Sequence, residues 1–235
     1  MFERAHHQLI AALLKQMDAQ TLLKNHCLLS GGTAILFTRG EYREALQIEF
    51  VCTSADAYRT VRQCVDGQDT SWLFRESVQI FREPNFDRHG IRLRALQNGA
   101  PIKIEVILEN RISTKALQLQ DRIEGVWCLS HEDLVATKLM ANAVRYADDS
   151  FLSRDIIDLS IITADGILST AGVAKARSAY GTNIDTALAR AKAMLLDGDE
   201  HLAKCMRELK MTMPAHELRM CIQRLDFADS MRWWE

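Results

Sequence analysis

The stretch from Leu28 to Phe50, LLSGGTAILFTRGEYREALQIEF, decides the fold that we expect for this chain. A short apolar run leads into SGGT at residues 30–33, an apolar segment follows as far as Gly40, and a β-type run begins at Ile48. A strand that enters a glycine turn and opens a helix presents free backbone N–H groups, which can hold phosphate. An acidic residue on the next strand, here Glu49, lies where such a site would hold a divalent metal. On its own, a Gly-Gly pair before a helix more often indicates only a tight turn.

Composition sets the outer limits of the interpretation. The chain has 235 residues, 48% of them hydrophobic, and a net charge of −2, which argues against nucleic-acid binding through bulk charge. No apolar run is long enough to span a bilayer, and the first residues, MFERAHHQ, are too polar for a signal peptide. The six cysteines are widely spaced without a C-x-x-C pair, so we expect buried reduced thiols and no zinc site. These features predict a cytoplasmic protein without membrane contact.

Periodicity predicts a mixed α/β region in the first half of the chain. Apolar residues at helical spacing cover residues 3–24, and Ser54 can cap a helix over 54–65. A short strand is expected at 78–81, with Pro84 as its breaker. Two alternating runs, 91–96 and 102–107, flank Asn98-Gly99 and predict a hairpin. Pro101 suggests that the loop of this hairpin is slightly longer than two residues.

Charged side chains are placed on particular faces of that hairpin. Alternation puts Arg92 and Arg94 on one face of the first strand, where with Arg82 and Arg88 they form the densest basic cluster and the expected site of any nucleic-acid contact. The same alternation puts Lys103 and Glu105 together on the second strand, which by itself indicates a solvent-facing ion pair.

From residue 126 onward the pattern is almost entirely helical. On the first helix Lys138 and Arg145 are two turns apart and share a face, and on the second Asp155 and Asp158 are neighbours. Taken alone, these four residues predict interhelical salt bridges. Further helices are expected near 170–180, 184–196, 199–211 and 215–230, and Trp233-Trp234 is expected to pack back on them.

Two blocks of the sequence, in this order, resemble the AbiEii/AbiGii-type nucleotidyltransferases, the toxin components of type IV toxin–antitoxin systems and their relatives. The first block is GGTA, then GEYR, then a strand of the form x-I-x-F; the second is E-D-L-x-x-x-K-L, then Arg145, then R-D-I-I-D-L. The resemblance covers residues 1–165. It implies an α+β fold with a nucleotidyltransferase-type mixed sheet flanked by helices over residues 1–125, followed by a C-terminal helical bundle over 126–235.

The resemblance also implies a reaction and a site. The reaction is transfer of a nucleoside monophosphate from a nucleoside triphosphate to a tRNA or protein hydroxyl, with Mg²⁺ or Mn²⁺ as cofactor and a cognate antitoxin as partner. The implied metal ligands are Gln47, Glu49 and Glu105. The implied catalytic residues are Glu49, Glu105 and Asp158. The implied nucleotide-binding residues are Ser30, Gly31, Gly32, Thr33, Arg43, Lys138, Arg145 and Asp155.

One motif departs from the family pattern. The family usually reads R-x-S-x-D-[IL]-D-F, and this chain has Arg43, Ala45, Gln47 and Glu49 at the defined positions. Gln47 offers a neutral oxygen where the family has a charged one, which lowers affinity for Mg²⁺. Three interpretations therefore stay open: a working nucleotidyltransferase with an unusual metal site, a catalytically impaired relative that binds nucleotide or a partner, and a scaffold that serves as an interaction module.

Overall fold

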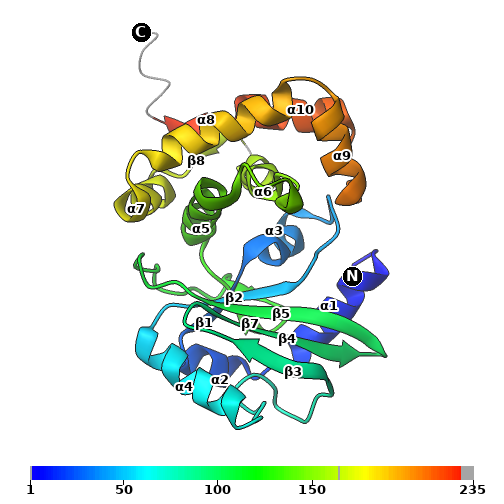
Figure 1. The fold of residues 1–235 in the computed structure, drawn as a ribbon, viewed down its shortest axis with the longest axis vertical. Helices are drawn as coiled ribbons and strands as arrows, with labels where there is room; N and C mark the ends of the chain where they lie inside the picture. Colours follow the sequence, from blue (N-terminus) through cyan, green and yellow to red (C-terminus); the bar gives the residue numbers. More distant parts are fainter. Residues whose placement is uncertain (1, 164, 229–235) are drawn as a thin grey trace. The chain divides into compact units, whose positions relative to one another are not determined.

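The computed structural model describes residues 2–163 and 165–228, which form two compact units (Figure 1). Unit 1 comprises residues 1–38 and 45–130, and unit 2 comprises residues 39–44 and 131–235. The short segment 39–44 therefore leaves unit 1 after its third helix and returns before its second strand. The domain boundary predicted between residues 125 and 126 stays a prediction.

Unit 1 is organised around a mixed five-stranded sheet in the order β1-β2-β5-β4-β3. Strand β2 runs parallel to β5, and the other neighbouring pairs are antiparallel. A separate two-stranded hairpin, β6 (Arg122–Ile123) with β7 (Val126–Trp127), follows the sheet. The five strands are β1 (Cys27–Ser30), β2 (Ile48–Cys52), β3 (Ile80–Phe86), β4 (Gly90–Gln97) and β5 (Ala100–Leu108).

Helices cover both faces of this sheet (Figure 1). Helices α2 (Ala19–Lys24) and α4 (Ala55–Asp66) lie against one face and α3 (Gly31–Arg39) lies on the other. The single helix expected over residues 3–24 is wrong: α1 (Ala5–Gln16) ends before Asp18, which starts α2. The carboxylate of Asp18 accepts hydrogen bonds from the N–H groups of Gln20 and Thr21, so it acts as the N-cap of a new helix.

Two further local predictions need correction. Strand β3 runs through Pro84 to Phe86 because it is an edge strand with register shifts, where a missing N–H removes no ladder bond. The hairpin loop has only two residues, Asn98 and Gly99, both at positive φ, and Pro101 already pairs with Leu96. That geometry fits a tight turn between twisted strands.

The described part of unit 2 has helices as its regular structure apart from the short parallel pair β8 (Ile167–Leu168) and β9 (Asp226–Phe227). Helix α5 contacts α6, α7 and α8. The segment 39–44 is fastened to this unit because Glu44 N–H donates to the carbonyl of Leu209 and Thr212 N–H donates to that of Tyr42. The helices are α5 (His131–Arg145), the 3-10 turn η1 (Asp149–Phe151), α6 (Arg154–Ile162), α7 (Thr170–Tyr180), α8 (Asn183–Leu196), α9 (Glu200–Glu208) and α10 (Ala215–Arg224).

The predicted fold class is confirmed: a mixed sheet flanked by helices is followed by helices in sequence. Residues 229–230 of the last predicted helix, and Trp233-Trp234, lie outside the described residues. Among the described residues, no helix is long and apolar enough to cross a membrane.

Candidate functional site

The turn between β1 and α3 has the features of a phosphate-binding corner. Gly31 adopts a φ of 69° and opens α3, so the first backbone N–H groups of this helix have no partner within the helix. Ser30 is completely buried, and its hydroxyl has no hydrogen-bond partner among the described residues. Thr33 Oγ1 donates to the carbonyl of Gln47, which ties the turn to the start of β2. A buried hydroxyl without a partner at a helix N-terminus is a feature that a bound ligand would explain.

The carboxylate of Glu49 lies directly against this turn. A Cβ atom placed on Gly31 would be 2.7 Å from Glu49 Oε1, closer than real Cβ contacts. Ser30 and Glu49 are also register partners in the β1–β2 ladder. The positive φ therefore favours glycine at position 31, and any side chain there would force the Glu49 carboxylate to move.

Replacement of Gly31 by alanine should destabilise the protein by more than a backbone effect alone. Both Gly31 and Gly40 have positive φ, but a Cβ on Gly40 would meet nothing within 4 Å. Gly40→Ala should cost about 1 kcal/mol, the usual penalty for a left-handed alanine, and Gly31→Ala should cost up to about 1 kcal/mol more, because Glu49 must also move. Urea unfolding of both variants measures the difference, and equal losses would contradict the placement of Glu49 against the turn.

Gln47 joins the two carboxylates that face this site. Glu49 and Glu105 are register partners across the parallel pair β2–β5, so their side chains leave the same face of the sheet. The Nε2 group of Gln47 donates to Glu49 Oε2 at 3.3 Å and, over a short contact, to Glu105 Oε2. Its amide hydrogens thus point toward both acids, which is the favourable orientation because a carbonyl oxygen would be repelled there.

Two cations already neutralise Glu105. Lys103 Nζ lies 3.0 Å and Arg92 Nε 3.3 Å from Glu105 Oε1. Burial alone would raise the pKa of Glu105, but the hydrogen bonds and charges of Lys103, Gln47 and Arg92 outweigh it and lower that pKa below its usual value. Glu105 is therefore an ionised carboxylate with its partners in place.

These residues do not fit a pair of divalent metal ions. Such ions need several carboxylate oxygens with uncompensated negative charge, whereas Glu49 and Glu105 share the amide donor of Gln47 and Glu105 also faces two cations. Within residues 2–163 and 165–228, no three His, Cys, Asp or Glu side chains gather in a way that could hold a metal. The metal-ligand roles of Gln47, Glu49 and Glu105 remain a prediction from the sequence.

In unit 2 the remaining predicted residues form a buried ionic network. Arg43 donates from Nε and Nη2 to the two oxygens of Asp158, each at 2.8 Å, and Lys138 Nζ lies 2.7 Å from Asp158 Oδ2 and 2.9 Å from Asp155 Oδ1. Arg145 closes the network on Asp155 at 2.6 Å. The side chains of Arg43, Lys138, Asp155 and Asp158 are all at most 5% exposed. The ammonium group of Lys138 is therefore paired with two buried carboxylates.

The charges of this network control the ionisation of its acids. Burial alone would raise the pKa of Asp158, but the charges and hydrogen bonds of Arg43 and Lys138 outweigh it and lower the pKa to about 2. Burial acts likewise on Asp155, and Lys138 and Arg145 hold its pKa well below the usual range. Both carboxylates stay ionised at neutral pH, and their negative charges balance the positive charges of Arg43 and Lys138.

The structure thus gathers the predicted site residues into two groups. Unit 1 holds the turn at residues 30–33 with Gln47, Glu49 and Glu105, and unit 2 holds Arg43, Lys138, Arg145, Asp155 and Asp158. Within each unit, the members of the group contact one another. The assignment of both groups to one nucleotide site stays a prediction.

Sequence reasoning missed two supporting residues. Tyr42 donates its hydroxyl to Asp158 at 2.8 Å. His7 is fully buried, and its Nε2 accepts the backbone N–H of Ala45 at 2.8 Å, which positions the segment leading into Gln47. The signal for His7 was its place on the apolar face of α1, one turn before Ile10 and two turns before Leu14.

A mixed sheet with a glycine turn into a helix, and with acids on the adjoining strands, agrees with the nucleotidyltransferase class of folds expected from the sequence. The family described as "Nucleotidyl transferase AbiEii toxin, Type IV TA system" matches residues 12–229, and the chain belongs to this family. Its members are nucleotidyltransferase-like proteins of type IV toxin–antitoxin systems, and the predicted family is thereby confirmed.

Among solved structures, the chain is similar to two proteins of Helicobacter pylori. One, titled as a candidate nucleotidyltransferase, is 17% identical over 95% of each chain, with a TM-score of 0.49. The other, JHP933, is 18% identical over 93% of this chain and 89% of that one, with a TM-score of 0.36. No curated protein matches the chain.

Proposed function

We propose that this member of the family binds a nucleoside triphosphate at the β1–α3 turn and transfers nucleotide weakly or not at all. The observation that carries the proposal is the hydroxyl of Ser30, buried and without a partner among the described residues, at the N-terminus of α3. Helix N-termini offer unpaired N–H groups and a positive dipole end, which together suit a phosphate. A phosphoryl oxygen would satisfy the Ser30 hydroxyl.

Weak transfer follows from the acid pair beside the turn. In the family's reaction the acceptor oxygen attacks the α-phosphorus and pyrophosphate leaves. The attacking oxygen and the leaving oxygen of pyrophosphate both need charge stabilisation in this step. Here Gln47 supplies amide hydrogens where the family has a second aspartate, and Glu49 is one methylene longer. A misplacement of about 1 Å at a reacting centre can cost roughly a hundredfold in rate.

A second candidate is the full family activity, transfer of a nucleoside monophosphate to a tRNA or protein hydroxyl by a toxin that has a cognate antitoxin. The convergence of Gln47, Glu49 and Glu105 on one face of the sheet favours it, because all three family positions meet. The nucleotide and the acceptor would then be two substrates of one site.

Replacement of Ser30 by alanine separates binding from folding. Because the hydroxyl has no partner, its loss should leave the free energy of unfolding unchanged or raise it, while nucleotide affinity should fall about tenfold through one lost hydrogen bond. Ser160→Ala is the matched control: Ser160 is equally buried but donates to the carbonyl of Ile157, so this variant should lose stability and keep nucleotide affinity.

Calorimetry with each nucleoside triphosphate measures affinity, and transfer of radiolabel from each α-labelled triphosphate to bulk tRNA and to protein measures turnover. We expect binding with incorporation near background. Robust incorporation would favour the second candidate. Absence of binding to all four nucleotides, with or without Mg²⁺, would leave only the scaffold and overturn the proposal.

A further inference from the structure

Three cations stand in a row across three adjacent strands of unit 1. Arg82 on β3 pairs in register with Arg94 on β4, and Arg94 pairs with Lys103 on β5. Directly opposite residues in antiparallel strands project from the same face with their side chains close together. We call Arg82, Arg94 and Lys103 the cation row.

Such a row is unfavourable without an anion. Like charges directly opposite each other destabilise a sheet, and here two such pairs follow one another. Lys103 is matched by Glu105, but Arg82 and Arg94 contact no acid among the described side chains. Among the described side chains no acid separates these two exposed arginines, so a negative group from outside the chain would complete the arrangement.

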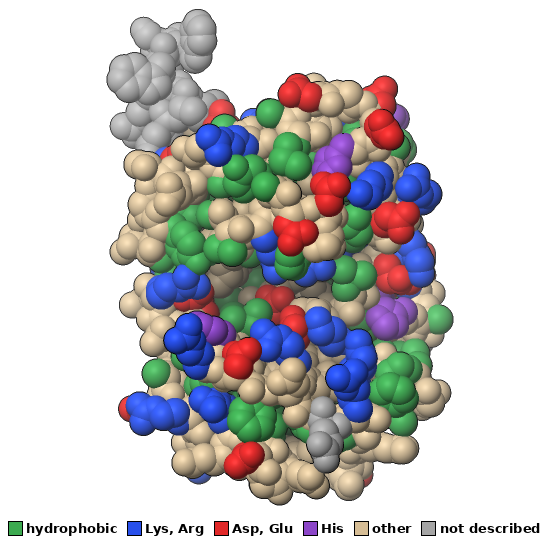
Figure 2. Space-filling view, in the orientation of Figure 1, with side chains coloured by type: hydrophobic (Ala, Val, Ile, Leu, Met, Phe, Trp, Pro, Cys, Tyr) green, Lys and Arg blue, Asp and Glu red, His purple; other side chains and the backbone are tan. Residues whose placement is uncertain are grey.

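The cation row lines a groove. A hollow of about 170 Å³ is bordered by all three of its members together with Asn85, Arg92 and Leu93. Figure 2 shows Lys and Arg side chains gathered on the face of unit 1 that is turned toward the viewer. Neighbouring strands lie about 4.8 Å apart, so the row extends over roughly 10 Å, the scale of a few linked phosphoryl groups and much shorter than a nucleic-acid track.

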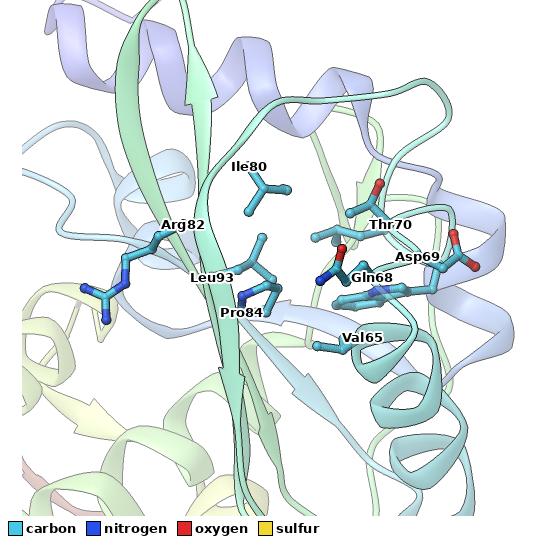
Figure 3. A pocket seen from close by; sticks show the side chains of 10 residues that line it. Val65, Gln68, Asp69, Thr70, Ile80, Arg82, Pro84 and Leu93 are labelled. Atoms are coloured by element: carbon cyan, nitrogen blue, oxygen red, sulfur yellow. The ribbon is translucent and has the colours of Figure 1, made fainter.

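A larger cavity nearby has a different character. It measures about 240 Å³ and lies between the end of α4, the following loop and β3, with Val65, Trp72, Leu73, Ile80 and Leu93 among its lining residues. Figure 3 shows that the side chain of Arg82 points away from this cavity. The guanidinium thus belongs to the groove and not to the mainly apolar cavity.

The groove adjoins the acids of the candidate site. On the neighbouring register line, Arg92 pairs with Glu105, Glu105 with Glu49, and Glu49 with Ser30. The cations therefore stand beside the place where the family binds metal, and Lys103 and Arg92 already contact one of its acids.

We propose that the cation row binds the polyphosphate chain of a nucleotide directly, without a divalent metal. The arginines supply fixed positive charge and paired N–H donors for phosphoryl oxygens, a role that metal ions fill in an intact family site. That the polyphosphate belongs to a nucleoside triphosphate rests on the proposed function, whereas binding of the anion by the row does not.

The test measures binding of inorganic triphosphate to the full chain by calorimetry in EDTA at low salt. We expect binding by the native protein, and a loss of tenfold or more in the double variant Arg82→Ala/Arg94→Ala. The control Lys24→Ala/Arg59→Ala removes the same net charge from exposed positions on α2 and α4 and should bind as the native protein does. Because the double variant relieves like-charge repulsion, its melting temperature should be unchanged or higher.

Several outcomes would overturn the inference: no binding in EDTA, binding only with Mg²⁺, equal affinity in the two double variants, or binding of long RNA alone. The two proposals can fail separately. If inorganic triphosphate binds through the row but nucleotides bind no differently in Ser30→Ala, the row stands and the turn site fails. If nucleotide binding depends on Ser30 but not on Arg82 and Arg94, the turn site stands and the row fails.

Discussion

Replacement of Asp158 by alanine is expected to lower the free energy of unfolding by about 3–5 kcal/mol, the largest effect of any single substitution considered. Asp158 is fully buried and is the common partner of Arg43, Lys138 and Tyr42. Without it, Arg43 and Lys138 would lose the carboxylate that they share. Breaking one side of a buried ion network leaves charge that water cannot reach.

Urea and thermal unfolding, followed by circular dichroism, measure this loss. Asp56→Ala is the matched control, because its pair with Arg59 is more than two-thirds exposed on both sides and should contribute less than about 1 kcal/mol. A loss for Asp158→Ala as small as that of the control would show that the network is not a stabilising feature of unit 2. Lys138→Ala should also destabilise the chain, since Lys138 is buried between two acids and does not end in solvent.

The same network predicts a dependence on pH. The pKa of Asp158 is lowered to about 2 in the folded protein, so its contribution is fully present above the unfolded value of about 4 and is lost as the pH falls toward 2. The lowered pKa of Asp155 acts in the same direction. Stability should therefore fall between about pH 4 and pH 2, and more gently in Asp158→Asn, which cannot titrate at this position.

The double substitution Gln47→Asp with Glu49→Asp is expected to create metal dependence where the native chain has little. It replaces the amide that donates to positions 49 and 105 by a third carboxylate. The positive charges of Arg92 and Lys103 then no longer balance the negative charge of the three acids. In EDTA the variant should be less stable than the native protein by about 1–3 kcal/mol, because like charges converge. Saturating Mn²⁺ or Mg²⁺ should restore that stability by binding the folded state.

Thermal unfolding with EDTA, Mg²⁺ and Mn²⁺ provides a readout that is independent of activity. The native melting temperature should not respond to the metals, and that of the double variant should rise by several degrees. Nucleotidyl transfer by the variant should reach or exceed the native level. Glu49→Asp alone is the control, since it keeps the Gln47 amide and should remain insensitive to metal.

Two results would contradict this account of Gln47. A native protein stabilised by metal as strongly as the double variant would mean that the amide does not block binding. A native protein that transfers nucleotide faster than the double variant would mean that Gln47 and Glu49 form a tuned site and not a depleted one.

The sequence alone determined the class of this protein and most of its elements. Glycines at a turn, an apolar run and alternating strands are local patterns, and local sterics and side-chain periodicity are enough to predict what they form. The departure at Gln47 and Glu49 was also visible there, because it is a matter of residue type. Local pattern gave the wrong element in two places. Asp18 divides the predicted helix because it caps the next one, and Pro84 lies within a strand because β3 is at the edge of the sheet.

Only the tertiary structure decided what the charged residues do. Spacing predicted salt bridges between the helices that carry Lys138 and Asp158, but only the packing of these helices decides that Lys138 lies between two buried carboxylates and does not face solvent. Cross-strand register decided that Arg82, Arg94 and Lys103 form one row and that Gln47 bridges Glu49 and Glu105. Register and burial join residues far apart in the chain, and electrostatic energy depends on those distances and on exclusion of water, neither of which a linear sequence contains.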